Sequence, residues 1–223
     1  MINFTLIQAA LPSLLRGTVV TLQIAAFSLL LGFVGGTFLG IAQTGKNILL
    51  RGLVAIYATI IRGTPMLIQI VFLYYVLSVV GINISAFWCA VLAIGINSSA
   101  YVSQIIRSGI LSVNYGQIEA AKTLGIKRRD LLRFIVLPQA LRVVLPALGN
   151  ESITLIKDSS LASLIGVMEL YKEGQTVISQ TYDALSVYCA IAAIYLIITT
   201  TLSYCITLLE RRLNRHVKHH QSF

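Results

Sequence analysis

The sequence predicts an all-α integral membrane protein with five transmembrane helices. Of its 223 residues, 57% are hydrophobic and only 11% are charged, which is too few for the surface of a soluble domain. Residues 17–45, 63–106 and 184–209 contain no Asp, Glu, Lys or Arg. Each run is longer than the ~20 residues that a helix needs to cross a bilayer. The runs lack the two-residue alternation of barrel strands, so helices are expected.

The distribution of Lys and Arg predicts the orientation. Basic residues follow the first span at Lys46 and Arg51, fill the segment 107–142 and follow the last span from Arg211 onward. Five crossings place these three regions on one side, and loops rich in Lys and Arg are cytoplasmic. The amino terminus is therefore expected outside and the carboxyl terminus inside. The net charge of +9 follows from this bias, and no nucleic-acid partner is expected because no basic stretch is interleaved with stacking aromatics.

The first span is predicted at residues 18–42, after a short amphipathic segment, 1–15, that we expect to lie in the membrane interface. Gly32, Gly36 and Gly40 recur along the span, and small residues at this spacing let a neighbouring helix approach closely.

The second span is predicted at residues 52–79 and is interrupted by Arg62-Gly63-Thr64-Pro65. Proline removes a helical hydrogen bond and arginine resists burial in lipid, so this helix is expected to kink or to adjoin protein and water there.

The third span is predicted at residues 85–106 and holds Asn97, Ser98 and Ser99 near its middle, where polar groups bond to other helices or face a cavity. The fourth is expected at 139–156, entered through Pro138 at a first helical position. It contains Glu151, and Asp158 follows its end. The last is expected at 183–209, after a stretch, 159–182, of short helical and irregular segments.

No metal site is expected. Cys89, Cys189 and Cys205 lie in apolar segments without paired spacing, which favours packing thiols over a disulfide or metal ligands. His216, His219 and His220 belong to a charged tail and are interpreted as solvated.

The basic segment 107–142 holds seven Lys or Arg residues but only two acids, Glu119 and Asp130. Its residues 116–124 predict a helix that Gly125 ends, because glycine adopts the left-handed conformation at little cost. Residues 127–136 predict a second short helix. The resulting elbow is either a docking knob for a partner or a basic loop resting on anionic headgroups.

The spacing of residues in this elbow resembles a known signature. Glu119-Ala120-Ala121, three residues, Gly125, nine residues, Ile135, one residue and Leu137-Pro138 resemble the EAA motif of permease subunits of bacterial ABC importers. Further segments resemble the polar amino acid branch of that family, so the resemblance covers about residues 10–215; these segments are 62–65, 97–101, 138–140 and 156–161.

The resemblance implies a type I, methionine-importer-like permease fold in the bacterial cytoplasmic membrane. Residues 1–223 would form one permease domain, with 116–138 as its coupling insert. The implied partners are an ABC ATPase dimer, a second copy of this permease or a related one, and an extracytoplasmic amino acid binding protein.

The resemblance also implies roles for residues of the insert. Glu119 would anchor the ATPase, Ala120 and Ala121 would permit close approach, Gly125 would set the turn, and Pro138 would end the motif. The chain contains no G-x-x-x-x-G-K-[ST] loop, so it is not expected to be an enzyme or to hold a cofactor; ATP–Mg would bind the partner ATPase.

Polar residues in the spans are the candidates for the substrate pathway: Asn97, Ser98, Glu151 and Asp158. Acids in a low-dielectric cavity favour cationic amino acids, although glutamine, cystine, glutamate or an opine would use the same machinery. Glu151 either contacts substrate or pairs with Arg142 or Lys157 for structural reasons. A channel or scaffold outside the transporter class is the alternative for the whole chain.

Overall fold

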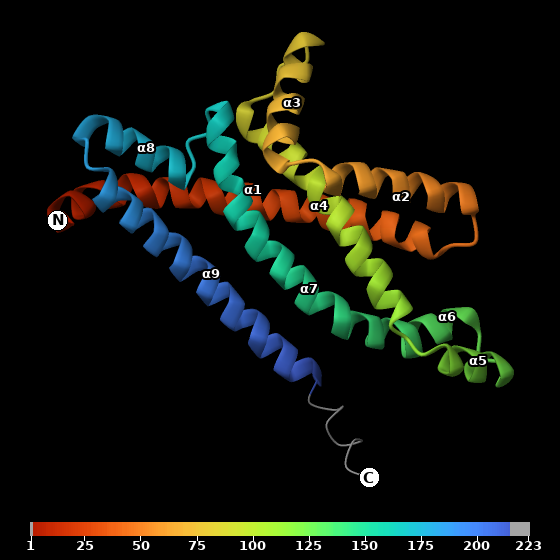
Figure 1. Cartoon of the computed structure of the whole chain (residues 1–223). Coiled ribbons are helices and arrows are strands. Elements are labelled where there is room, and N and C mark those ends of the chain that lie inside the picture. Colours follow the sequence, from red (N-terminus) through yellow and green to blue (C-terminus); the bar gives the residue numbers. More distant parts are fainter. Residues whose placement is uncertain (1, 215–223) are drawn as a thin grey trace.

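A computed structural model describes residues 2–214, which form helices and connecting turns without a β-strand in that range (Figure 1). His216, His219 and His220 lie outside the described residues. Four described helices, or helical stretches, are long and apolar enough to cross a membrane, and a bent pair of helices supplies a fifth crossing if it counts as one span. The predicted all-helical membrane fold is confirmed.

The first helix, α1 (Phe4–Thr44), is one continuous element, so the prediction of a separate interfacial segment at residues 1–15 is wrong. Asn3 caps it by accepting a hydrogen bond from the Leu6 amide at 3.1 Å, and Pro12 lies inside it. Ala10 and Leu14 are buried against apolar residues from the carboxyl-terminal part of the chain: Leu170, Val187, Ala190 and Ile191. This packing keeps the helix continuous through a proline that would otherwise favour a break.

The second predicted span consists of two helices, α2 (Ile48–Gly63) and α3 (Met66–Val79), whose axes bend by 104°. The kink predicted at Arg62–Pro65 is therefore confirmed. Pro65 lies at the start of α3, where its missing N–H costs no helical hydrogen bond. Figure 1 shows α3 projecting away from the direction of α1 and α2.

The helix α4 (Ala86–Leu111) crosses α1 at very short range. A Cβ atom on Gly36 would lie 2.8 Å from the Ser99 carbonyl oxygen, and one on Gly40 would lie 2.7 Å from the Ser103 carbonyl oxygen. Only glycine fits at these positions, so the predicted role of the glycine spacing in helix packing is confirmed.

The basic insert contains α5 (Tyr115–Thr123), a turn at Gly125 with φ +70°, and α6 (Arg128–Asp130). A π-helical turn, η1 (Leu131–Val136), then joins α6 directly to α7 (Leu137–Asp158). The helix thus does not begin at Pro138, as predicted, but continues through it. Pro138 has no N–H for the carbonyl four residues earlier, and the π-turn, in which Leu137 N donates to Leu132 O, carries the backbone past it.

The remaining chain is helical with one irregular connection. A 3₁₀ turn, η2 (Ser159–Ile165), ends at Gly166 in the left-handed conformation, and α8 (Leu170–Thr181) then lies against the amino-terminal half of α1 (Figure 1). The last helix, α9 (Ala184–Asn214), begins after Asp183, whose carboxylate accepts hydrogen bonds from Ser186 N and Oγ. This agrees with the predicted short segments at 159–182.

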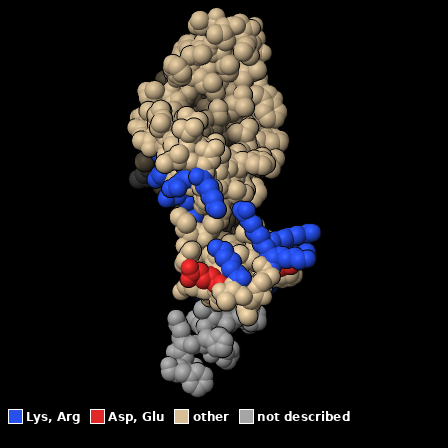
Figure 2. All heavy atoms as spheres, turned by 90° about the vertical axis from the view of Figure 1, so that its right-hand side faces the viewer, with Lys and Arg blue, Asp and Glu red and all other residues tan. Residues whose placement is uncertain are grey.

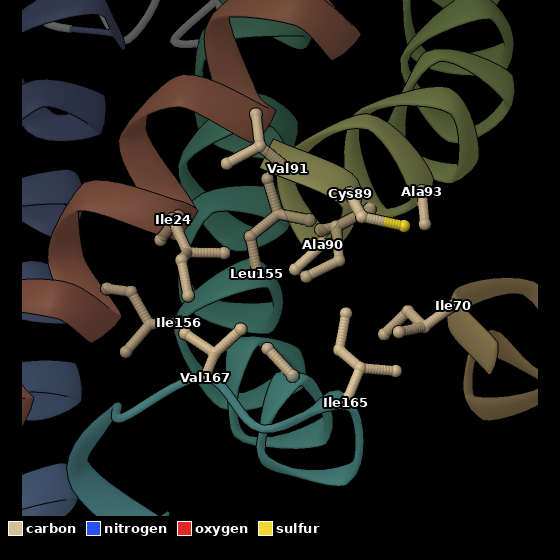
Figure 3. Close-up of a cluster of buried hydrophobic side chains, with 13 residues drawn as sticks. Ile24, Ile70, Cys89, Ala90, Val91, Ala93, Leu155, Ile156, Ile165 and Val167 are labelled. Atoms are coloured by element: carbon tan, nitrogen blue, oxygen red, sulfur yellow. The ribbon is translucent and has the colours of Figure 1, made fainter. Parts of the chain in front are cut away.

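The main buried cluster joins α1, α3, α4, α7 and η2 (Figure 3). Ile24, Ile70 and Leu155 meet in it, beside the free thiol of Cys89. Cys189 and Cys205 are also free, but both are exposed, so the predicted packing role holds only for Cys89.

Candidate functional site

The bend between α2 and α3 is held by one side-chain amide. Gln69 Nε2 donates to Ile61 O at 2.7 Å and to Thr64 Oγ1 at 2.6 Å, both on the α2 side of the bend. Gln69 Oε1 accepts from Asn97 Nδ2 of α4 at 2.9 Å. A carbonyl left without its helical donor is thereby satisfied, and the bend is fixed to α4.

A cavity of about 680 Å³ opens beside this bend, between α4 and α7. It is lined by Arg62, Gly63, Thr64, Pro65, Met66, Asn97, Tyr101, Ala147, Asn150, Glu151, Thr154 and Asp158. Three of the four residues predicted for the substrate pathway, Asn97, Glu151 and Asp158, line it. We call it the bend cavity. Its volume lies in the range typical of small-molecule sites.

Ser98, the fourth predicted residue, does not line the bend cavity. It is fully buried at the α1–α4 crossing, where its hydroxyl donates to Glu151 Oε1 at 2.8 Å. Ser98 therefore fixes the position of the Glu151 carboxylate and has no surface for a ligand.

The contacts of Glu151 bear on the ion pair that was predicted as its alternative role. The Ser98 hydroxyl donates to its carboxylate, and neither Arg142 nor Lys157 forms an ion pair with it in the described part of the chain. The predicted alternative, a structural ion pair, is not formed. The carboxylate keeps acceptor capacity toward the cavity.

A cation lies on another wall of the bend cavity. The Arg62 guanidinium lies over the Tyr101 ring, 5.1 Å from its centroid, which holds the charge by a cation–π contact. The cavity thus presents one guanidinium from α2, two carboxyl groups from α7 and the neutral polar groups of Asn97, Asn150 and Thr154. Such a set complements a ligand that carries charges of both signs.

Several residues of this site were not among those predicted from the sequence: Gln69, Tyr101, Asn150 and Thr154. Gln69 carried a detectable signal, because it is the one polar residue in the run Met66–Tyr74 apart from the terminal tyrosine. Asn150 likewise precedes Glu151 directly. The role of Tyr101 depends on a contact with α2 that no local pattern reveals.

The elbow formed by the insert is a compact unit with its own small core. Ala121 is buried together with Val113, Leu131 and Val136, whereas Ala120 is exposed. The two alanines are therefore not equivalent: Ala121 permits α5 to approach the helix that follows, and only Ala120 faces outward. Glu119, Gly125 and Pro138 are exposed as well.

The outer surface of the elbow is both apolar and basic. Large hydrophobic side chains are exposed there: Tyr115, Leu124, Leu132 and Phe134. Phe134 is exposed, whereas its neighbour Ile135 packs against the small core of the elbow. Figure 2 shows Lys and Arg gathered over the end of the molecule that carries this insert. An apolar patch with a charged rim is typical of a protein-binding surface.

A second buried acid, Glu169, lies far from the bend cavity at the start of α8. Its carboxylate accepts hydrogen bonds from the backbone amides of Tyr171 at 2.9 Å and Lys172 at 2.8 Å, and from Tyr195 Oη at 3.3 Å. Burial raises the pKa of Glu169, and these hydrogen bonds oppose the rise. Glu169 caps α8 and ties it to α9, so its role is structural.

Comparison with known proteins identifies what the chain resembles as a whole. The sequence profile of the family described as "Binding-protein-dependent transport system inner membrane component" matches residues 32–219. The glutamine transport system permease protein GlnP of Escherichia coli (strain K12) is 39% identical over 95% of this chain and 97% of its own length. The nopaline transport system permease protein NocM of Agrobacterium fabrum is 40% identical over 97% of this chain and 94% of its own.

Solved structures agree. A crystal structure of an amino acid ABC transporter with histidines matches with a TM-score of 0.89 and 37% identity, over 95% of this chain and 99% of the other. An inward-facing structure of the MetNI methionine ABC transporter matches with a TM-score of 0.77 and 22% identity, over 90% and 96%. The second likeness supports the predicted methionine-importer-like fold.

Proposed function

Because this chain belongs to the family of inner membrane components of binding-protein-dependent transport systems, we propose that it is the membrane-spanning subunit of an ATP-driven amino acid importer. Residues 1–223 form one permease domain in this proposal, and 116–138 are its coupling insert. The observation that carries it is the bend cavity, where Arg62 and the acids Glu151 and Asp158 face the same space.

The proposed substrate is an amino acid with a cationic side chain. Such a molecule carries two positive charges and one carboxylate, and the bend cavity offers two carboxyl groups and one guanidinium. We assign the α-carboxylate of the substrate to Arg62, because a guanidinium binds carboxylate oxygens with a planar pair of donors. Glu151 and Asp158 accept the two cationic groups, and Asn97 contributes a neutral polar wall.

A second substrate class has an observation of its own. The amides of Asn97 and Asn150 and the hydroxyl of Thr154 line the same cavity, and these groups suit the side-chain amide of glutamine. The relatives are named for substrates as different as glutamine and nopaline at nearly equal identity, so overall similarity does not select the substrate.

The proposed energy source is a separate ATPase dimer docked on the elbow. The exposed side chains of Leu124 and Phe134 would provide an apolar contact, and Glu119 of the same elbow is exposed as well. Closure of the two ATPases would move the elbows of two permease subunits and turn the cavity from one side of the membrane to the other. The second permease is another copy or a related chain, and an extracytoplasmic binding protein delivers substrate.

Uptake by the reconstituted complex tests the proposal. The permease is assembled in proteoliposomes with the ATPase and the binding protein, and uptake of radiolabelled arginine is measured with and without ATP inside the vesicles. Lysine and histidine are expected to compete with arginine, and glutamine, glutamate and cystine to compete poorly. ATP-independent equilibration would contradict the importer, and preferential competition by glutamine would select the second substrate class.

A further inference from the structure

A second cavity, of about 660 Å³, lies between α1, α2 and α4 and contains three arginines, Arg51, Arg62 and Arg107. We call it the arginine cavity. It adjoins the bend cavity, because Arg62 and Gly63 line both. No acidic residue is among the described residues that line it, so the positive charges are not neutralised within its walls. Three cations around one partly enclosed space repel one another unless an anion joins them.

The wall behind the arginines supplies further hydrogen-bonding groups. Gln43, near the end of α1, is buried at 8% exposure, and its Oε1 accepts from Gln104 Nε2 of α4 at 3.1 Å. That bond does not use the N–H donors of Gln43. Gln43 and Gln104 both line the cavity, and Thr59 adds a hydroxyl. The cavity walls therefore carry amide and hydroxyl donors in addition to the three guanidinium groups.

The remaining wall and its surroundings are apolar. Ile48, Ala55 and Ala58 of α2 line the cavity beside the arginines. Further apolar side chains along α2 are exposed, as expected for a helix that contacts lipid; they are Leu49, Leu53, Ile56 and Ile60. A ligand with an anionic head and a hydrocarbon tail fits this combination better than a small soluble anion does.

The position of the cavity indicates which lipid leaflet reaches it. It lies beside the turn between α1 and α2, at the same end of the molecule as the basic insert (Figures 1 and 2). Positive residues concentrate on the cytoplasmic side of membrane proteins, and basic pockets between helices on that side bind anionic headgroups.

We propose that the arginine cavity binds the phosphate group of an anionic phospholipid from the cytoplasmic leaflet. Arg51 and Arg107 hold the phosphate oxygens with their guanidinium groups, and the acyl chains lie along α2. The bound phosphate links the α1–α2 turn to α4. It also neutralises the space next to Arg62, whose side chain borders the bend cavity.

The lipid retained by the purified complex tests this inference without reference to substrate. The complex is reconstituted in nanodiscs of phosphatidylethanolamine mixed with phosphatidylglycerol, extracted in detergent, and its bound lipids are quantified by mass spectrometry. The wild type is expected to retain phosphatidylglycerol in excess over its share of the mixture. The Arg51→Gln, Arg107→Gln double variant is expected to retain less by at least about tenfold, since it loses two charge-assisted contacts.

The matched control is Lys46→Gln. It removes a positive charge from the same turn, but Lys46 does not line the cavity, so retention should match the wild type. An Arg51→Lys, Arg107→Lys variant keeps the charges and loses the forked geometry, and it is expected to recover part of the binding, which also shows that the fold is intact.

Two outcomes would overturn the inference. One is equal retention of phosphatidylglycerol by the wild type and the double glutamine variant. The other is displacement of the lipid by inorganic phosphate at millimolar concentration with the same dependence on Arg51 and Arg107, which would assign the cavity to a small soluble anion. Because neither readout involves uptake, the inference and the proposed transport function fail separately.

Discussion

Replacing Glu151 by glutamine is the most direct test of the bend cavity. The substitution keeps the shape of the side chain and an acceptor for the Ser98 hydroxyl, which donates to Oε1 at 2.8 Å, but it removes the negative charge. Glu151 lies half-buried in the wall of an open cavity, so an effective dielectric constant of about 20 applies, and an ammonium at about 4 Å would gain up to about 4 kcal/mol. Desolvation of the ammonium offsets part of this gain.

A charge-assisted hydrogen bond contributes about 1.5–3 kcal/mol net, which corresponds to about 10- to 150-fold in affinity. We therefore expect Glu151→Gln to raise the KM for arginine uptake in proteoliposomes by that factor, with assembly of the complex unchanged. The matched control is Glu173→Gln, which removes an acid of α8 that does not line the cavity and should leave uptake unchanged. Equal KM values for Glu151→Gln and the wild type would refute a contact between Glu151 and substrate.

Three further predictions concern the elbow, the crossing of α1 and α4, and the cap of α8 at Glu169. Gly125→Val should destabilise the turn by about 1–3 kcal/mol, because a β-branched residue resists φ +70°. Glu119→Lys should weaken the ATPase contact. In both variants ATP hydrolysis, measured together with uptake, should be uncoupled from transport, and normal coupling in both would exclude the elbow as the docking site. Gly36→Leu should separate α1 from α4 and lower the yield of assembled complex in size-exclusion chromatography, and wild-type yield would contradict the close crossing. The pKa of Glu169 is raised in the folded state, so the protonated side chain stabilises the fold below its ordinary pKa of 4.5, and this stabilisation is lost as the pH rises through the folded-state pKa. The Tm of the complex should therefore fall over that pH window, and Glu169→Gln should remove the fall. The same dependence of Tm on pH in that variant would contradict the assignment to Glu169.

Elements set by length, charge and local conformation were predictable. Each uncharged run is long enough to cross the bilayer, which predicts the spans. Gly125 predicts a turn because the backbone there adopts the left-handed conformation that glycine favours. Two helix starts that were predicted wrongly both involve proline. At Pro12 and Pro138 the local preference for a break loses to packing of Leu14 against α8 and α9 and to a π-turn before α7.

The arrangement of the bend cavity was only partly predictable. Asn97 and Glu151 were conspicuous because each is polar within an apolar span. Their joint presence beside Arg62 depends on how α2, α4 and α7 are aligned, and that alignment is set by contacts between residues far apart in sequence, such as Gln69 with Asn97. The arginine cavity could not be predicted from the sequence for the same reason. Its arginines come from separate helices, and each one alone looks like an ordinary basic residue at the end of a membrane span.

An uninterrupted helical path from Arg128 to Asp158 connects the elbow to the bend cavity. At 1.5 Å per residue the path is about 45 Å long, and the π-turn at 131–136 is its one departure from α-helical geometry after α6. In the proposed importer, a displacement of the elbow would reach Glu151 and Asp158 along this continuous helix. Substitutions in the π-turn that restore regular α-helix would therefore change how a movement of the elbow is passed to the cavity, while leaving the cavity side chains unchanged.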